Sequence, residues 1–63
     1  MRTTEQYEVI FNIAQMRKVI TGQEMDLDNL QKYDVGSMTY QELNDLQNRL
    51  IPDYNQAINS INN

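Results

Sequence analysis

The N-terminal third of the chain has apolar residues at the three- and four-residue spacing of an amphipathic helix. The members of this repeat are Val9, Ile13, Met16 and Ile20. Thr3 precedes the repeat and Gln6 follows three residues later, which is the pattern of a capping box. Gly22 stands where a left-handed residue ends many helices. The pattern therefore predicts a helix over about 3–21.

The apolar face of this first helix is wider than a single partner helix requires, because Tyr7 and Phe11 lie beside the main stripe. Two interpretations are open. The helix contacts more than one neighbouring element, or the whole face is used as the core of a very small domain.

A second helix is predicted over about 39–58. Thr39 and Glu42 form another capping box, and Met38 with Leu43 has the spacing of a hydrophobic staple. An apolar stripe then follows at helical spacing. Its members are Leu43, Leu46, Leu50, Tyr54, Ala57, Ile58 and Ile61. Pro52 removes one helical hydrogen bond, so we expect a bend or a break there and a frayed tail beyond residue 58.

Residues 23–37 between the helices are harder to interpret. Apolar Met25 and Leu27 alternate with acidic residues, and Tyr33 and Val35 alternate in the same way. With a turn between these two runs, the alternation favours a short β-hairpin. The alternative is a helical turn over 26–31 followed by an extended segment at 33–35.

These elements predict one small domain over 1–63. Its fold class is α+β and mostly helical, with two antiparallel helices joined by a short β-hairpin or an irregular connection. A chain of 63 residues buries a modest core. It contains no cysteine, so disulfides cannot add stability, and oligomerisation and close helix packing remain as the sources of extra stability.

Composition excludes several classes of function. The chain has neither histidine nor cysteine, which removes the usual ligands of zinc and the usual nucleophile–base pairs. Its net charge of −4 argues against direct binding to DNA. No apolar run has the roughly 20 residues of a membrane span, and no signal-peptide pattern opens the chain. We therefore expect an intracellular or intravirion protein.

No residue pattern points to a catalytic, cofactor or metal site. Asp26, Asp28 and Asn29 resemble the start of a calcium loop, but the required glycine and glutamate do not follow at the sixth and twelfth positions. Ser37 lies at a helix entry and Ser60 in the tail that is expected to fray, and two separated glycines cannot form a phosphate loop. The sequence predicts a protein that is not an enzyme.

The four tyrosines are candidates for contact with partners, because tyrosine buries a large ring while its hydroxyl stays hydrated. Tyr40 falls off the apolar stripe of the second helix, which favours an interface role. For Tyr33 and Tyr54, a role in the core is an equally good explanation. The acidic run over 24–34 is a solvated face or a docking surface for a basic partner.

Two stretches together resemble the small gpW-like head-completion and head–tail connector proteins of tailed phages. These are residues 19–23 (Val-Ile-Thr-Gly-Gln) and residues 33–46 (Tyr-Asp-Val-Gly-Ser-Met-Thr-Tyr-Gln-Glu-Leu-Asn-Asp-Leu). The ordered combination carries the resemblance, since each motif alone is generic. The chain departs from the pattern in its acidic charge, its longer 24–32 segment and its Pro52.

The resemblance implies a structural protein of the virion or host cytoplasm. Such a protein would self-associate as a ring or another homo-oligomer, bind the phage portal and offer a surface to tail proteins. The alternative function is a small acidic regulator or inhibitor that binds a host protein.

Overall fold

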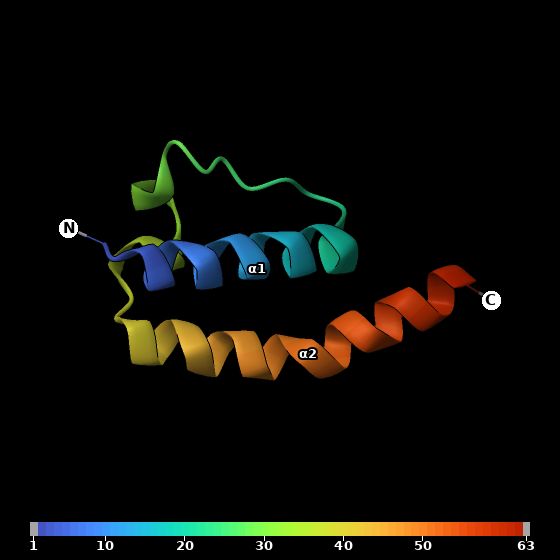
Figure 1. Cartoon of the computed structure of the whole chain (residues 1–63). Coiled ribbons are helices and arrows are strands. Elements are labelled where there is room, and N and C mark those ends of the chain that lie inside the picture. The colour runs from blue at the N-terminus through green and yellow to red at the C-terminus, as the bar shows by residue number, and fades with distance from the viewer. Residues whose placement is uncertain (1, 63) are drawn as a thin grey trace.

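The structure is a computed structural model that describes residues 2–62 of the chain. Two long helices, α1 (Thr4–Thr21) and α2 (Tyr40–Asn62), pack side by side. Two short 3₁₀ helices, η1 (Leu30–Lys32) and η2 (Asp34–Ser37), interrupt the connection between them. Figure 1 shows α1 lying between the returning connection on one side and α2 on the other.

The caps of α1 are those that the sequence predicts. The Thr3 hydroxyl accepts a hydrogen bond from the Gln6 amide at 3.2 Å, and the Gln6 side chain accepts one from the Thr3 amide at 2.8 Å. Gly22 adopts the left-handed conformation with φ 79°, and its N–H donates to the Lys18 carbonyl at 2.8 Å. The predicted capping box and terminating glycine are confirmed.

The start of α2 is also confirmed. The Thr39 hydroxyl accepts from the Glu42 amide at 3.2 Å, and the Glu42 carboxylate accepts from the Thr39 amide at 3.0 Å. Pro52 lies inside the helix, which bends near its middle in Figure 1 but does not break. The predicted fraying after residue 58 is not seen, because α2 continues to Asn62. Asn63 lies outside the described residues.

The predicted β-hairpin over 23–37 is wrong. No residue of this stretch forms a strand. The Asp26 carboxylate accepts bonds from the Asp28 amide at 3.1 Å and from the Asn29 side chain at 2.9 Å, which closes a local turn in place of a strand ladder. The alternative placed its helical turn over 26–31 and an extended segment at 33–35. The observed 3₁₀ turns fall later, and residues 34–37 are not extended.

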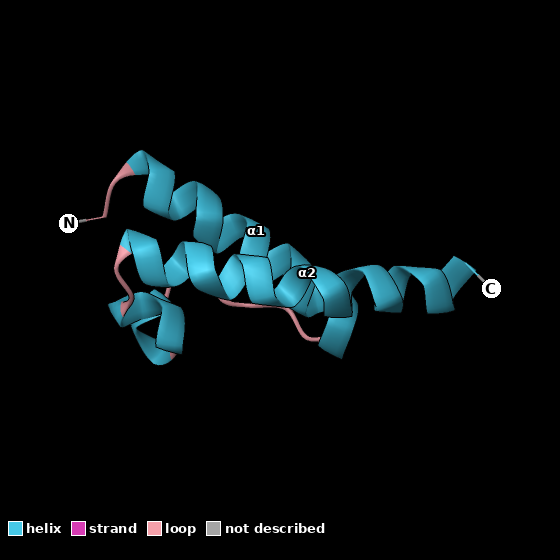
Figure 2. Cartoon of the chain, turned by 90° about the horizontal axis from the view of Figure 1, so that it is seen from below, coloured by secondary structure: helices cyan, strands magenta, loops and turns pink. Residues whose placement is uncertain are grey.

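The predicted antiparallel arrangement of the two helices is also wrong. Figures 1 and 2 show α1 and α2 beginning at the same end of the molecule and running in the same direction. The Arg2 guanidinium bonds the Gly36 carbonyl shortly before α2 begins, and Asn12 donates to Gln47 at 3.1 Å further along. The helices are parallel because the connection travels back along α1 before α2 starts.

The core lies at the end where both helices begin. It combines side chains from α1, both 3₁₀ helices and α2. The buried members of this cluster are Val9, Ile10, Ile13, Leu30, Val35 and Leu43. α1 therefore packs on two sides, against α2 and against the connection, while Tyr7 and Phe11 themselves stay about half exposed. The interpretation that α1 contacts more than its partner helix is thus confirmed.

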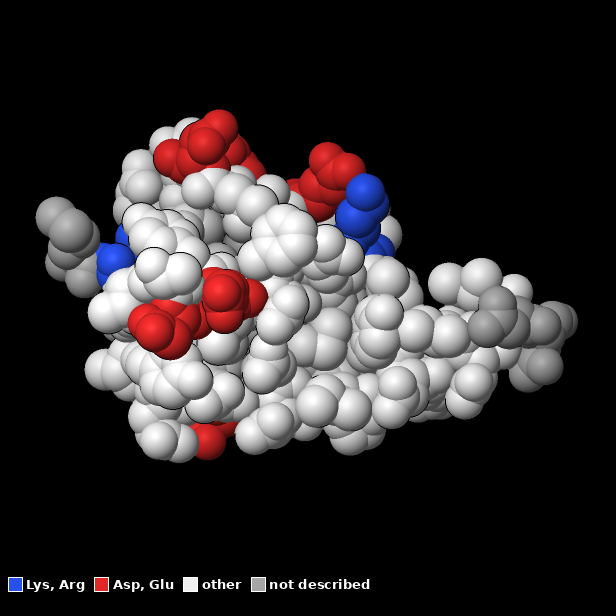
Figure 3. All heavy atoms as spheres, in the orientation of Figure 1, with Lys and Arg blue, Asp and Glu red and all other residues white. Residues whose placement is uncertain are grey.

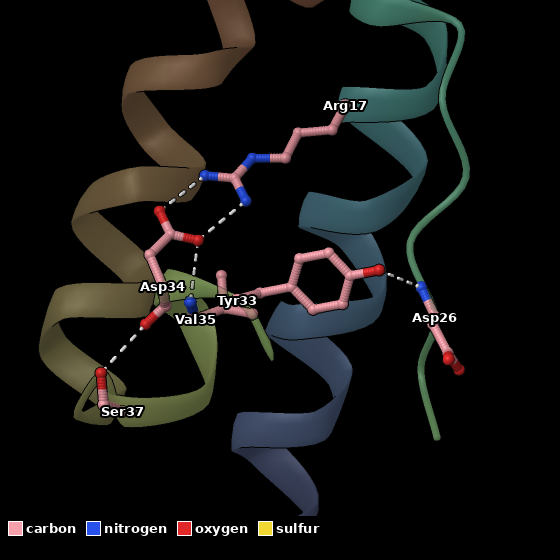
Figure 4. Close-up of polar contacts among 6 residues, drawn as sticks. All are labelled: Arg17, Asp26, Tyr33, Asp34, Val35 and Ser37. Carbon is pink, nitrogen blue, oxygen red and sulfur yellow. Dashed lines mark hydrogen bonds and ion pairs between the residues drawn. The ribbon is translucent and has the colours of Figure 1, made fainter. Parts of the chain in front are cut away.

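Polar contacts tie the connection to α1 (Figure 4). The Tyr33 hydroxyl accepts a bond from the Asp26 amide at 2.8 Å, which joins the returning stretch to the 3₁₀ turns. The two terminal nitrogens of Arg17 donate to the two carboxylate oxygens of Asp34, each at 3.0 Å. Asp34 also accepts from the Val35 amide at 2.9 Å. These contacts hold η2 against α1.

The two glycines should respond differently to replacement by alanine. A Cβ at Gly36 would overlap the backbone carbonyl of Leu30, so Gly36→Ala must separate η1 from η2 and is expected to cost about 1–3 kcal/mol. A Cβ at Gly22 meets no atom within 4 Å, so Gly22→Ala costs only the left-handed strain, about 1 kcal/mol. Chemical denaturation measures both, and equal losses would contradict this account of Gly36.

The Arg17–Asp34 pair should make stability fall in acid. The hydrogen bond from Arg17 lowers the pKa of Asp34 against a smaller opposing effect of burial. A carboxyl with a lowered pKa stabilises the fold above its unfolded value, about 3.9, and loses that contribution as pH falls through the folded pKa. Because the side chain of Asp34 is 53% exposed, we expect less than about 1 kcal/mol.

Asp34→Asn should therefore flatten the loss of unfolding free energy between about pH 5 and pH 2. Arg17→Gln should have the same effect, and the double variant should add little to either single change. Urea denaturation across this pH range measures the three slopes. Additive effects of the two substitutions would show that the two side chains do not act as a pair.

Candidate interaction surfaces

The structure places the residues that the sequence considered for metal binding in a local turn. Both carboxylate oxygens of Asp26 already accept hydrogen bonds, and the bond from Asn29 is the main reason that the Asp26 pKa is lowered. Across residues 2–62, no group of three or more acidic side chains converges as metal ligands would. Within the same range, neither helix is long and apolar enough to cross a bilayer.

The four tyrosines differ in their exposure and contacts. Tyr33 packs against the core and its hydroxyl accepts the Asp26 amide bond, so its role is structural. Tyr54 is half-buried on the part of α2 that lies after Pro52. Tyr7 and Tyr40 are exposed on α1 and on the first turn of α2. The interface role of Tyr40 stays a prediction.

One exposed apolar surface lies between α1 and the returning connection. Three large side chains gather there, and we call this surface the aromatic groove: Tyr7, Phe11 and Leu27. Tyr7 is 50% exposed and Phe11 49%. They flank a hollow of about 470 Å³ whose floor includes the buried Ile10 and Leu30. A smaller hollow of about 270 Å³ adjoins it, past Phe11 toward Lys18.

A second exposed apolar surface is the end of α2, residues 53–62, which we call the arm. Figures 1 and 2 show its last turns extending past the end of α1. The stripe that packs on α1 through Leu46 and Leu50 continues along the arm as Tyr54, Ile58 and Ile61. Ile61 is 71% exposed. Because Tyr54 and Ile58 are half-buried, the fold leaves the apolar stripe of the arm only partly covered.

The arm makes the molecule elongated. A compact chain of this length would have a radius of gyration of about 10.6 Å, whereas the Cα value here is 12.0 Å, with extents of 42 × 21 × 17 Å. The excess length agrees with an element that projects from the body.

Charge is concentrated on the body and nearly absent from the arm (Figure 3). Asp53 is the one charged residue in the segment 53–62. On the body, Glu24 pairs with Lys18 at 2.7 Å and Asp34 pairs with Arg17 at 3.0 Å. The hydrogen bond from Lys18 lowers the pKa of Glu24. The remaining surface of the body is acidic, and the arm is polar but almost neutral.

Sequence reasoning found part of the aromatic groove and missed the rest. Tyr7 and Phe11 stand out in the sequence because they lie beside the main stripe of α1. Leu27 gives no such signal, because its position beside α1 depends on the path of the connection. The arm was missed because the direction of α2 relative to α1 decides whether its last turns are covered.

Comparisons with known proteins do not assign the chain to a family. The chain has no significant match among protein-family models, curated protein sequences or solved structures.

Proposed function

We propose that this chain is a non-enzymatic assembly module that associates with copies of itself through its exposed apolar surfaces. The observation that carries the proposal is the arm, an amphipathic helical segment whose apolar stripe extends beyond α1. Water-exposed apolar stripes at helical spacing are typical of helices that dock on a partner. The small core gives such docking a second role, because association adds stability to a chain of this size.

More specifically, we propose a head-completion or head–tail connector protein of a tailed phage, located in the virion or host cytoplasm. Support comes from the ordered motifs that resemble the gpW-like proteins. In the structure, residues 19–23 form the capped end of α1, and residues 33–46 form η2 and the capped start of α2. The hairpin and the antiparallel helices expected from the sequence are not formed, so the motif order and the apolar surfaces carry this proposal.

The proposed connector would assemble on the portal and present its remaining surface to the tail. Both activities are binding events, which suits a chain whose exposed features are apolar and acidic surfaces. The alternative, a small acidic regulator of a host protein, draws support from the acidic body in Figure 3. However, the net charge of the chain, −4, is low for a protein that competes with nucleic acid for a basic site.

Mass measurement of the purified chain, alone and with the portal protein of the same phage, tests the proposal. We expect a mass above the monomer's 7.4 kDa that rises with protein concentration, and co-elution with the portal. A gene position beside the portal and terminase genes would agree with this result. A monomer that ignores the portal would contradict the proposal, and a defined complex with a host nuclease or polymerase would favour the alternative.

A further inference from the structure

The arm and the aromatic groove are two different apolar surfaces with complementary shapes on one chain. The arm is a convex helix, and the groove is a hollow between α1 and the connection. We infer that the arm of one copy lies in the aromatic groove of a second copy, in a head-to-tail contact. This inference rests on the self-association proposed above and does not depend on the assignment to phages.

The arm cannot occupy the groove of its own chain. The groove is formed beside the N-terminal half of α1, by residues that include Tyr7 and Phe11, and the arm leaves the body at the opposite end (Figures 1 and 2). Because α2 is a continuous helix from Tyr40 to Asn62, bringing the arm back would require the helix to break. A second copy supplies an arm without any such change.

The dimensions of the two surfaces agree. A helical segment of about ten residues is about 15 Å long at 1.5 Å per residue. The two adjoining hollows follow α1 from Thr4 to Lys18, a distance of about 21 Å by the same rise. The arm places Tyr54, Ile58 and Ile61 at i, i+4 and i+7, which is the spacing of anchors in helices that bind in grooves.

The distribution of charge favours the arm, over any other part of a second copy, as the segment that occupies the groove. Of the nine acidic residues, only Asp53 lies within 53–62, so eight belong to the rest of the chain. Contact between two bodies would therefore bring like charges together, whereas the nearly neutral arm avoids this repulsion.

In a linear assembly of copies joined by this contact, one copy at one end keeps a free arm and the copy at the other end keeps a free groove. Such a contact closes into a ring when the rotation between neighbours permits it. A helix of about ten residues buries less than the ~800 Å² per partner of a standard interface. Each contact should therefore be weak by itself, and ring closure should strengthen it through the high effective concentration of the last pair.

Two single variants and their mixture test the contact. Ile61→Glu places a charge on the apolar stripe of the arm, and Phe11→Glu places one in the groove beside Glu8. Both positions are exposed, so circular dichroism should show a folded chain. Each variant alone should associate at least about tenfold more weakly than the wild type, as expected for a central anchor. Asn59→Glu, on the polar side of the arm, is the matched control and should associate like the wild type.

Mixing the two variants distinguishes this contact from others. Ile61→Glu keeps an intact groove and Phe11→Glu keeps an intact arm, so the mixture should form a 1:1 heterodimer and no larger species by native mass spectrometry. Wild-type association of Phe11→Glu would overturn the inference and point to arms that pack on each other. Absence of heterodimer from the mixture would also overturn it. Either result leaves the proposed function standing if the wild type still forms oligomers and binds the portal.

Discussion

The fold is organised around the burial of Leu30 and Val35 against α1. These side chains bring the connection back to the end of the molecule where α1 begins, and there they share a core with Ile13 and Leu43. Because η2 ends just before Thr39, this packing fixes the point at which α2 starts. The close approach of Gly36 to the Leu30 carbonyl and the Arg17–Asp34 pair hold the two turns in place.

The position and direction of α2 decide which surfaces stay exposed. Since α2 starts beside the beginning of α1 and has 23 residues against 18, its last turns pass the end of α1. The same return path places Leu27 beside Phe11 and forms the aromatic groove. The arm and the groove are therefore consequences of a single feature, the folded connection, and both leave apolar area that a second copy can bury.

The sequence predicted what depends on local chemistry. Both capping boxes and the glycine end of α1 follow from short-range hydrogen bonds, and these were correct. Alternation at Tyr33 and Val35 suggested a strand, but Val35 is buried within a 3₁₀ turn and the Tyr33 hydroxyl binds the Asp26 amide, contacts that the local pattern does not encode. The parallel arrangement was missed because amphipathic stripes show which faces meet and do not show in which direction the helices run. The arm was missed for the same reason, and Leu27 was missed because its position beside α1 depends on the path of the connection.

We propose that association between copies covers apolar surface that the single chain leaves exposed. The most direct test of this proposal is the unfolding midpoint in urea measured from micromolar to millimolar protein. A chain stabilised by self-association should gain up to about 1.4 kcal/mol for each tenfold increase in concentration above its dissociation constant. We expect a midpoint that rises with concentration. A midpoint that stays constant across the whole range would contradict it.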